Sequence, residues 1–209
     1  MSARSALLLT RIPAKTAISI AGLLLLGALG ACVGPAREPL ESLSELNSGE
    51  TIVVGSIELV PALAKDEQKI KGIGTANFEN KIIMIMDENY RVLKSEPVIA
   101  DYAGRIEAIL GKNFFVRSDS KPFYLLGGML YLSVGGREIS RVYFPGGLKA
   151  SLKPGDKAIY IGTLQYHRNE FFDISKMQIV DNYESANTEF KKKFGSKYTL
   201  RKALLTQSK

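Results

Sequence analysis

Short apolar segments separated by turn residues dominate the chain after residue 50. Two of them, 51–60 (TIVVGSIELV) and 81–86 (KIIMIM), are rich in β-branched residues and end at Pro61 and at the polar turn that begins with Asp87. Runs of this kind, bounded by turn residues, are typical of β-strands. We therefore expect two strands here, with a long polar loop at 62–78 between them.

Apolar runs and turn residues then alternate from residue 113 onward. The runs are 113–117, 123–126, 129–134, 138–144 and 148–153, and the turn signals between and after them are Gly127-Gly128, Gly135-Gly136, Pro145-Gly146-Gly147 and Pro154-Gly155-Asp156. The double glycines are interpreted as turns that need positive φ. Several short strands at this spacing predict an antiparallel β-sandwich.

Two longer runs, 157–166 and 170–180, predict a central hairpin with His167-Arg168-Asn169 as its turn. On a regular strand, residues an even number of positions apart point to the same side of the sheet. We therefore expect Tyr160, Leu164 and Tyr166 to share one face.

One short helix is predicted ahead of these strands. Asp101 has the position of an N-cap, Tyr102, Ile106, Ile109 and Leu110 would share one side, and Gly111 would end the helix.

A second helix is predicted near the C-terminus. Asp181 and Glu184 have capping-box spacing, and an apolar stripe of Tyr183, Ala186, Phe190 and Phe194 runs up to Gly195. A further short amphipathic segment at 200–205 is expected to pack against the sandwich.

The first 31 residues have a different pattern. Arg4, Arg11 and Lys15 precede an apolar run at 16–31 that ends in small residues, which is the order of a secretory signal peptide. An uncleaved anchor stays open as an alternative, because the uncharged stretch 16–36 has 21 residues and is long enough to span a bilayer. Gly27, Gly30, Gly34 and Pro35 interrupt its apolar core and favour cleavage.

The end of this leader carries a specific motif. Leu29-Gly30-Ala31-Cys32 resembles, at all four positions, the lipobox of bacterial lipoprotein precursors. The resemblance implies that Cys32 receives a diacylglyceryl group through its sulfur and that the leader is removed. Because Val33 rather than Asp follows, it also implies the outer membrane, with the protein facing the periplasm. Cys32 is the only cysteine and cannot form an internal disulfide; cleavage without lipid remains the other alternative.

The formal net charge of +7 is concentrated at the two ends of the chain. Residues 1–31 carry +3 and residues 184–209 carry +5, which leaves −1 for the body. This distribution argues against a nucleic-acid-binding stripe across the folded domain. The basic residues that could contact an anionic surface, such as lipid headgroups, are Lys191, Lys192, Lys193, Lys197, Arg201 and Lys202. The alternative is a solvated helix end, where the helix dipole favours cations.

The sequence offers little catalytic chemistry. His167 is the only histidine, so a zinc site would lack partners, and no glycine cluster matches a nucleotide-binding motif. Glu170 and Asp173 are an odd number of positions apart and would point to opposite faces of a strand. We therefore expect no catalytic residue, no metal and no cofactor.

A second resemblance concerns the body. Tyr160-Ile161-Gly162 entering a hairpin, and Asp181-Asn182-Tyr183 leading into a basic terminal helix, resemble uncharacterised Gram-negative envelope lipoproteins with a small immunoglobulin- or transthyretin-like sandwich, over residues 110–205. The expected organisation is a signal peptide at 1–31, a lipidated Cys32 and flexible tether at 32–50, a β-sandwich at 51–183, and a basic helix and tail at 184–209.

The expected function is a lipid-anchored, non-catalytic module that binds or scaffolds an envelope protein or a glycan. Two alternatives stay open. One is a carboxylate-dependent hydrolase of peptidoglycan or glycan, which a cleft with two converging acids would favour; the other is an accessory lipoprotein of secretion or transport.

Overall fold

The computed structural model describes residues 36–37, 40, 42, 46–68, 80–87, 89–90, 92, 104–119, 121–134 and 138–208. The predicted signal peptide, the motif Leu29-Gly30-Ala31-Cys32 and the alternative membrane span therefore lie outside the described residues, apart from residue 36. Within the described ranges, no helix is both long enough and apolar enough to cross a bilayer.

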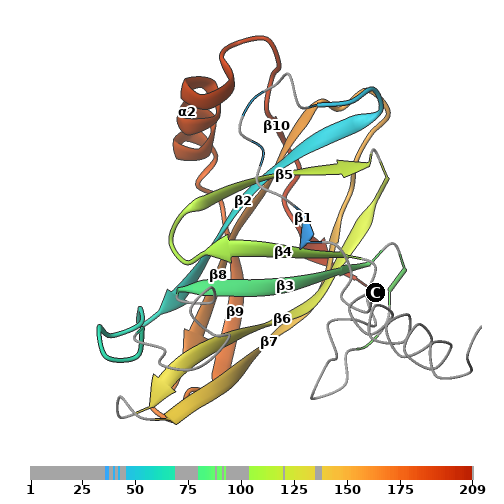
Figure 1. Cartoon of the computed structure of the whole chain (residues 1–209). Coiled ribbons are helices and arrows are strands. Elements are labelled where there is room, and N and C mark those ends of the chain that lie inside the picture. The colour runs from blue at the N-terminus through green and yellow to red at the C-terminus, as the bar shows by residue number, and fades with distance from the viewer. Residues whose placement is uncertain are drawn as a thin grey trace, which may run out of the picture. The chain divides into compact units, whose positions relative to one another are not determined.

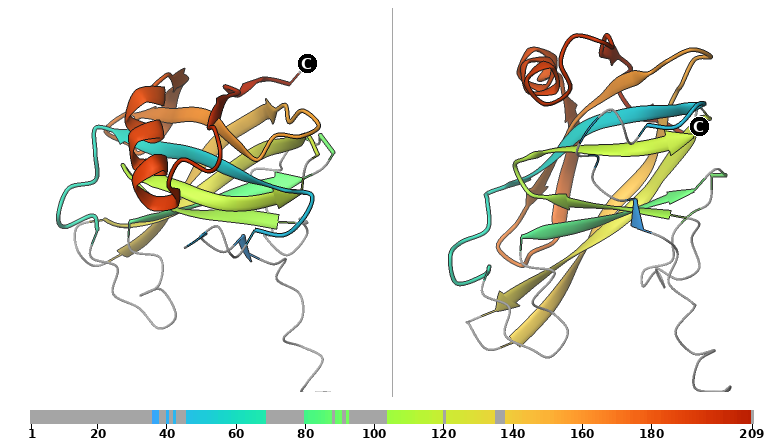
Figure 2. Two further views of the ribbon diagram at one scale, coloured as in Figure 1. Left: turned by 90° about the horizontal axis from the view of Figure 1, so that it is seen from above. Right: turned by 45° about the horizontal axis from the view of Figure 1, so that its top comes forward.

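The described body is mainly β and forms two packed sheets (Figures 1 and 2). The first sheet has the order β1 (Ala36–Arg37), β4 (Gly104–Ile109), β3 (Lys81–Asp87), β6 (Phe123–Val134), β7 (Glu138–Ala150) and β11 (Thr206–Gln207). The second has the order β10 (Arg201–Lys202), β8 (Ala158–Arg168), β2 (Glu50–Val60) and β5 (Asn113–Asp119), with β9 (Ile174–Val180) paired to β8. The helix α2 (Tyr183–Phe194) follows β9. The prediction of a mainly β sandwich is confirmed.

Two hydrophobic clusters hold these layers together. The larger one fills the space between the sheets, and Val53 and Ile57 of β2 belong to it. The smaller one lies between the outer face of the second sheet and α2, and it contains Ile52 and Val54 of the same strand. Both faces of β2 are therefore buried, which explains why its sequence is almost continuously apolar.

The pairing of β2 with β8 is parallel, whereas an antiparallel sandwich was predicted. Ile52 pairs with Ala158 and Val60 with His167, and the short strands β1 and β10 also pair in parallel. The remaining pairings are antiparallel. β2 and β8 are far apart in sequence and run in the same direction. No hairpin turn connects them, so no local sequence pattern predicts their pairing.

Two of the predicted glycine turns do not exist. The segments on either side of Gly127-Gly128 form the single strand β6, and those on either side of Pro145-Gly146-Gly147 form the single strand β7. Gly127 and Gly147 do have positive φ, at 155° and 73°. At Gly146, by contrast, a Cβ would lie 2.3 Å from the carbonyl carbon of Leu126, so this residue is glycine because two backbones approach each other closely.

The predicted helix at 101–111 is wrong where the structure describes it, because Gly104–Ile109 is the strand β4. Asp101 and Tyr102 lie outside the described residues. Ile106 and Ala108 are buried while Glu107 between them is partly exposed, which is the period of a strand. Pairing with β3 along the whole of β4 supplies backbone hydrogen bonds that outweigh the helical spacing of its apolar residues.

The strand β8 runs through His167 to Arg168, so these two residues are not in a turn as predicted. Opposite Gly55, the register of β8 shifts by one residue at Gly162, which has a φ of 103°. This bulge reverses the alternation of side chains. Tyr160 therefore packs toward α2, whereas Leu164 and Tyr166 lie between the sheets, and the three do not share a face.

The C-terminal helix is confirmed at 183–194 and ends at Gly195. The predicted capping box is not formed: Asn182 is the N-cap and makes no side-chain cap bond, while Asp181 Oδ1 accepts a hydrogen bond from the Tyr183 amide. Ala186, Phe190 and Phe194 are buried as predicted. The segment 200–205 also packs on the body, through buried Leu200 and Leu205, and contributes β10 rather than a helix.

The predicted tether at 32–50 contains residues that are held against the body. Ala36 and Arg37 pair with Arg105 and Ile106 of β4. Leu40 is 1% exposed, and its amide donates a hydrogen bond to the Phe115 carbonyl at 2.8 Å. The described part of this segment is therefore docked rather than flexible.

Candidate functional site

The described body has a groove that runs from the end of β2 to the beginning of α2. It consists of two adjoining hollows that share Glu58, Gly111 and Lys112. The first, of about 510 Å³, is mainly aliphatic, with Leu59, Val60, Ala62, Leu63, Gln68, Asn80, Ile109 and Leu110 as its other lining residues. The second, of about 450 Å³, is mainly polar, with Ser56, Asn113, Thr163, Asn182, Ser185, Ala186 and Glu189.

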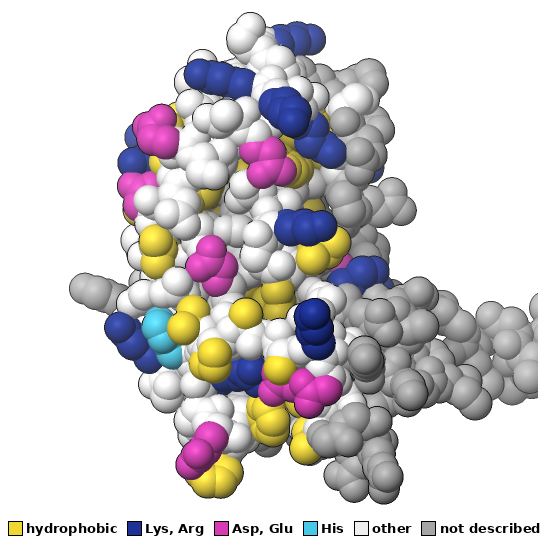
Figure 3. All heavy atoms as spheres, turned by 90° about the vertical axis from the view of Figure 1, so that its left-hand side faces the viewer, with side chains coloured by type: hydrophobic (Ala, Val, Ile, Leu, Met, Phe, Trp, Pro, Cys, Tyr) yellow, Lys and Arg dark blue, Asp and Glu magenta, His cyan; other side chains and the backbone are white. Residues whose placement is uncertain are grey.

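The groove lies on the side of the molecule that Figure 3 presents. Hydrophobic side chains gather in the lower half of this face, whereas charged side chains are spread over both halves. A surface that combines an apolar zone with a polar one suits a ligand that has both characters.

The floor of the polar hollow is a network of hydroxyl and amide groups. Ser56 Oγ and Thr163 Oγ1 are 2.7 Å apart, and both residues are buried. Asn182 donates from Nδ2 to Thr163 Oγ1 at 3.2 Å and from its backbone amide to the Tyr160 hydroxyl at 2.9 Å. The bulge at Gly162 brings Thr163 to this face. Because these groups satisfy one another, they form a fixed floor.

Two carboxylates from different elements line the polar hollow. Glu58 of β2 accepts a hydrogen bond from Gln165 Nε2 at 3.0 Å, and Glu189 of α2 accepts one from Asn113 Nδ2 at 2.6 Å. Each bond uses one carboxylate oxygen and leaves the other oxygen as an acceptor for a ligand. No sequence pattern indicates this pair, because its members are brought together only by the packing of α2 on the sheet.

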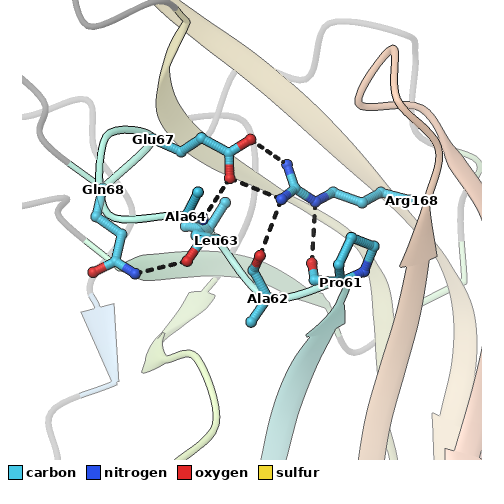
Figure 4. Close-up of polar contacts among 7 residues, drawn as sticks. All are labelled: Pro61, Ala62, Leu63, Ala64, Glu67, Gln68 and Arg168. Carbon is cyan, nitrogen blue, oxygen red and sulfur yellow. Dashed lines mark hydrogen bonds and ion pairs between the residues drawn. The ribbon is translucent and has the colours of Figure 1, made fainter.

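One wall of the groove is a loop, residues 61–68, that Arg168 fastens to β8 (Figure 4). Arg168 donates from Nη1 and Nη2 to the two carboxylate oxygens of Glu67, each at 2.8 Å, and also to the carbonyls of Pro61 and Ala62, each at 3.1 Å. The side chains of Arg168 and Glu67 are only 6% and 14% exposed. The hydrogen bond from Arg168 lowers the pKa of Glu67. This wall is therefore preformed, which reduces the entropy lost on binding.

The acids singled out from the sequence are not brought together. Glu170 and Asp173 are exposed in the turn between β8 and β9. His167 lies in β8, where Nε2 is 3.2 Å from Gln165 Oε1. Within the described ranges, no three His, Cys, Asp or Glu residues gather as a metal site would require.

The six predicted basic residues divide into two groups. Lys191, Lys192, Lys193 and Lys197 are exposed at the end of α2 and in the loop that follows it. Arg201 and Lys202 are instead held by carboxylates of the protein itself: Arg201 Nε donates to Asp156 Oδ1 at 2.7 Å, and Lys202 Nζ to Asp181 Oδ2 at 2.6 Å. Four of the six residues are therefore exposed lysines at the end of α2 and just after it, whereas the other two form ion pairs with carboxylates of the protein itself.

The pair formed by Asp156 and Arg201 predicts a pH-dependent contribution to stability. The hydrogen bond from Arg201 holds the pKa of Asp156 below its usual 3.8. The ion pair therefore contributes fully to the free energy of unfolding above pH 3.8, and this contribution is lost as the pH falls through the lowered pKa. Asp156→Asn should reduce the free energy of unfolding by about 1 kcal/mol at pH 7, because the pair is partly exposed.

Urea unfolding of both proteins between pH 7 and pH 2.5 measures this effect, and the difference between wild type and variant should shrink toward the acid end. Asp66→Asn changes an exposed acid in the loop 61–68 and should alter neither the free energy of unfolding at pH 7 nor its dependence on pH. A difference for Asp156→Asn that grows as the pH falls would contradict the ion-pair explanation.

A scan against models of known protein families, a search of curated proteins and a search of solved structures find no match to this chain.

Proposed function

We propose that this chain is a lipid-anchored protein of the bacterial outer membrane that faces the periplasm and acts as a non-catalytic binding or scaffolding module. The observation that carries the proposal is the motif Leu29-Gly30-Ala31-Cys32 at the end of an apolar leader, with Cys32 as the single cysteine. One chain of about sixteen carbons supplies on the order of 10 kcal/mol of membrane affinity, and two chains give stable anchoring.

The groove supports the binding part of the proposal and indicates the partner. Its first hollow is lined by aliphatic side chains, and Glu58 and Glu189 in the second hollow each keep one oxygen for a ligand. We propose a segment of another envelope protein that places apolar side chains against Leu59 and Leu110 and a basic side chain between the two glutamates. Such a segment would match both the apolar and the charged character of the groove.

Photocrosslinking in the living cell tests this partner. A photoreactive residue in place of Ile109, which lines the groove and is 43% exposed, should crosslink to a discrete envelope protein. The matched control is the same residue in place of Phe171, which is 73% exposed in the β8–β9 turn, outside the groove. Equal crosslinking at the two positions would contradict the proposal, and crosslinks to peptidoglycan strands would assign the groove to a glycan instead.

Charge removal gives a second expected outcome. Glu58→Gln combined with Glu189→Gln should lower the crosslinking yield at position 109 by roughly five-fold, because two solvent-exposed charge pairs together supply about 1 kcal/mol. The yield should be unchanged in Glu170→Gln combined with Asp173→Asn, which removes two exposed acids outside the groove. A partner that binds through the aliphatic hollow alone would show no loss in either variant.

A hydrolase of peptidoglycan or glycan is the second candidate, because two carboxylates line one hollow as such an enzyme requires. It predicts that the purified protein releases soluble fragments from peptidoglycan and that either Glu58→Gln or Glu189→Gln abolishes the release. Absence of fragments with the wild-type protein would dismiss this candidate and leave the binding proposal in place.

A further inference from the structure

The end of α2 carries a compact group of cations, Lys191, Lys192, Lys193 and Lys197, which we call the basic end. All four residues are exposed. Within the described part of the chain, Lys191, Lys192 and Lys197 form no ion pair, whereas Arg201 and Lys202 are paired with Asp156 and Asp181. A helix dipole favours cations in the last turn, but Lys197 lies beyond that turn. Lys191, Lys192 and Lys197 therefore present positive charge that no ion pair within the described residues compensates.

The N-terminal segment first meets the body at β4, where Ala36 and Arg37 pair, and then passes beside the basic end at Leu40. Leu40 belongs to the hydrophobic cluster of Phe115 and Phe194, and its amide binds the Phe115 carbonyl at 2.8 Å. Lys193 Nζ lies 5.8 Å from the ring centroids of the same two phenylalanines. Leu40 and Lys193 thus meet at Phe115, on one side of the second sheet.

The length of the chain limits how far the anchor can be from this point. Leu40 follows Cys32 by eight positions, and a fully extended chain covers at most about 3.6 Å per residue, or roughly 29 Å. A lipid at Cys32 keeps Leu40 within that distance of the bilayer and so holds the basic end beside it at a high effective concentration. Clusters of lysines next to a membrane anchor are attracted to anionic lipids within a Debye length of about 8 to 10 Å.

We infer that the basic end contacts anionic phospholipid headgroups of the membrane that holds Cys32, and that this contact orients the sandwich. The inference rests on the lipid anchor proposed above. At the opposite end of α2, Asn182 and Ser185 line the groove, whereas Glu189 lies about one turn from the basic end; the 12-residue helix is about 18 Å long. With the basic end on the bilayer, the part of the groove at the start of α2 is held away from the membrane and open to a partner.

A single tryptophan reports this contact directly, because the chain contains none. Ser196 is exposed between Lys193 and Lys197. The full-length chain with Ser196→Trp is expressed, purified as the processed protein, and reconstituted into vesicles that contain brominated phosphatidylcholine, either alone or with 30% phosphatidylglycerol. We expect at least two-fold stronger quenching with phosphatidylglycerol at low salt, and loss of this excess in 0.5 M salt. Phe171→Trp, at the β8–β9 turn, should be quenched equally in both vesicles.

Charge variants separate a specific contact from general attraction. In the Ser196→Trp background, changing Lys191, Lys192, Lys193 and Lys197 to Gln should abolish the phosphatidylglycerol-dependent quenching. The matched control changes four exposed lysines elsewhere, Lys65, Lys121, Lys153 and Lys176, to Gln and should retain it. Circular dichroism and thermal unfolding confirm that both variants are folded. Equal loss in the two variants would overturn the inference.

The intact mass of each reconstituted sample distinguishes failure of this inference from failure of the anchor. An acylated protein whose Ser196→Trp quenching is the same in neutral and anionic vesicles overturns the orientation inference and leaves the anchor standing. Quenching that appears only when lipopolysaccharide replaces phosphatidylglycerol overturns the assignment to phospholipid. An unmodified Cys32 thiol overturns the anchor, and the inference with it.

Discussion

Gly146→Ala is expected to lower the free energy of unfolding by at least about 3 kcal/mol and to prevent folding in the cell. A Cβ at this position would lie 2.3 Å from the carbonyl carbon of Leu126, 2.4 Å from the amide nitrogen of Gly127 and 2.6 Å from the carbonyl oxygen of Leu125. All three are backbone atoms of β6, so relief requires β6 and β7 to separate. Overpacking that displaces backbone commonly costs 1–3 kcal/mol and occasionally more, out of a typical total of about 5–15 kcal/mol.

Urea denaturation followed by circular dichroism measures this loss. Gly155→Ala is the matched control, because a Cβ there meets no atom within 4 Å although the residue has a φ of 88°. Gly155→Ala should lower the free energy of unfolding by only about 1–2 kcal/mol, the strain of placing alanine in the left-handed backbone region. If the two variants were equally stable, the close approach of β6 and β7 at Gly146 would not be a feature of the protein in solution.

Arg168→Met is expected to destabilise the protein by about 3 kcal/mol and to release the loop 61–68. The substitution leaves the largely buried Glu67 carboxylate without its cationic partner and deprives the carbonyls of Pro61 and Ala62 of a donor. Removing one member of a buried pair costs about 3–5 kcal/mol, because an uncompensated charge remains. Hydrogen exchange should therefore show faster exchange in the loop 61–68, and urea unfolding should show the lower stability.

The pH dependence of this loss follows from the lowered pKa of Glu67. Its usual value is 4.5, and the hydrogen bond from Arg168 lowers it in the folded protein. The contribution of the pair is thus complete above that pH and disappears as the pH falls through the lowered value, so wild type and Arg168→Met should converge in strongly acid solution. Lys202→Met is the control, since its pair with Asp181 is exposed and its removal should cost much less. An equal loss in both variants would contradict a structural role for Arg168.

Local sequence patterns were sufficient for much of the fold. The segments 51–60 and 81–86 are strands, and the stripe of Ala186, Phe190 and Phe194 forms the buried face of a helix that ends at Gly195. These elements could be predicted because the spacing of apolar residues and the terminating residues lie close together in the sequence. Tertiary contacts do not override them.

Features that depend on distant contacts were missed. The apolar residues of 104–109 fit a helix as well as a strand, and pairing with β3 decides between them. Gly127-Gly128 and Gly146-Gly147 have the composition of turns, but at Gly128 and Gly146, in the middle of β6 and β7, the backbone of a neighbouring strand leaves no space for a Cβ. A sequence alone does not distinguish a glycine needed for its φ from one needed for lack of space.

The groove was not predictable from the sequence for the same reason. Arg168 and Glu67 are 101 positions apart, and Glu58 and Gln165 are 107 positions apart. Each of these residues has the properties of an ordinary solvated side chain in its own segment. Only the parallel pairing of β2 with β8 and the packing of α2 bring them to one surface.

The most direct test of the central claim is the intact mass of the mature protein extracted from envelopes with detergent. The proposal predicts a chain that begins at Cys32 and carries a diacylglyceryl group on its sulfur, with a further acyl group on the new amino terminus in bacteria that add one. A protein that retains residues 1–31, or that begins at Cys32 with an unmodified thiol, would contradict the lipid anchor.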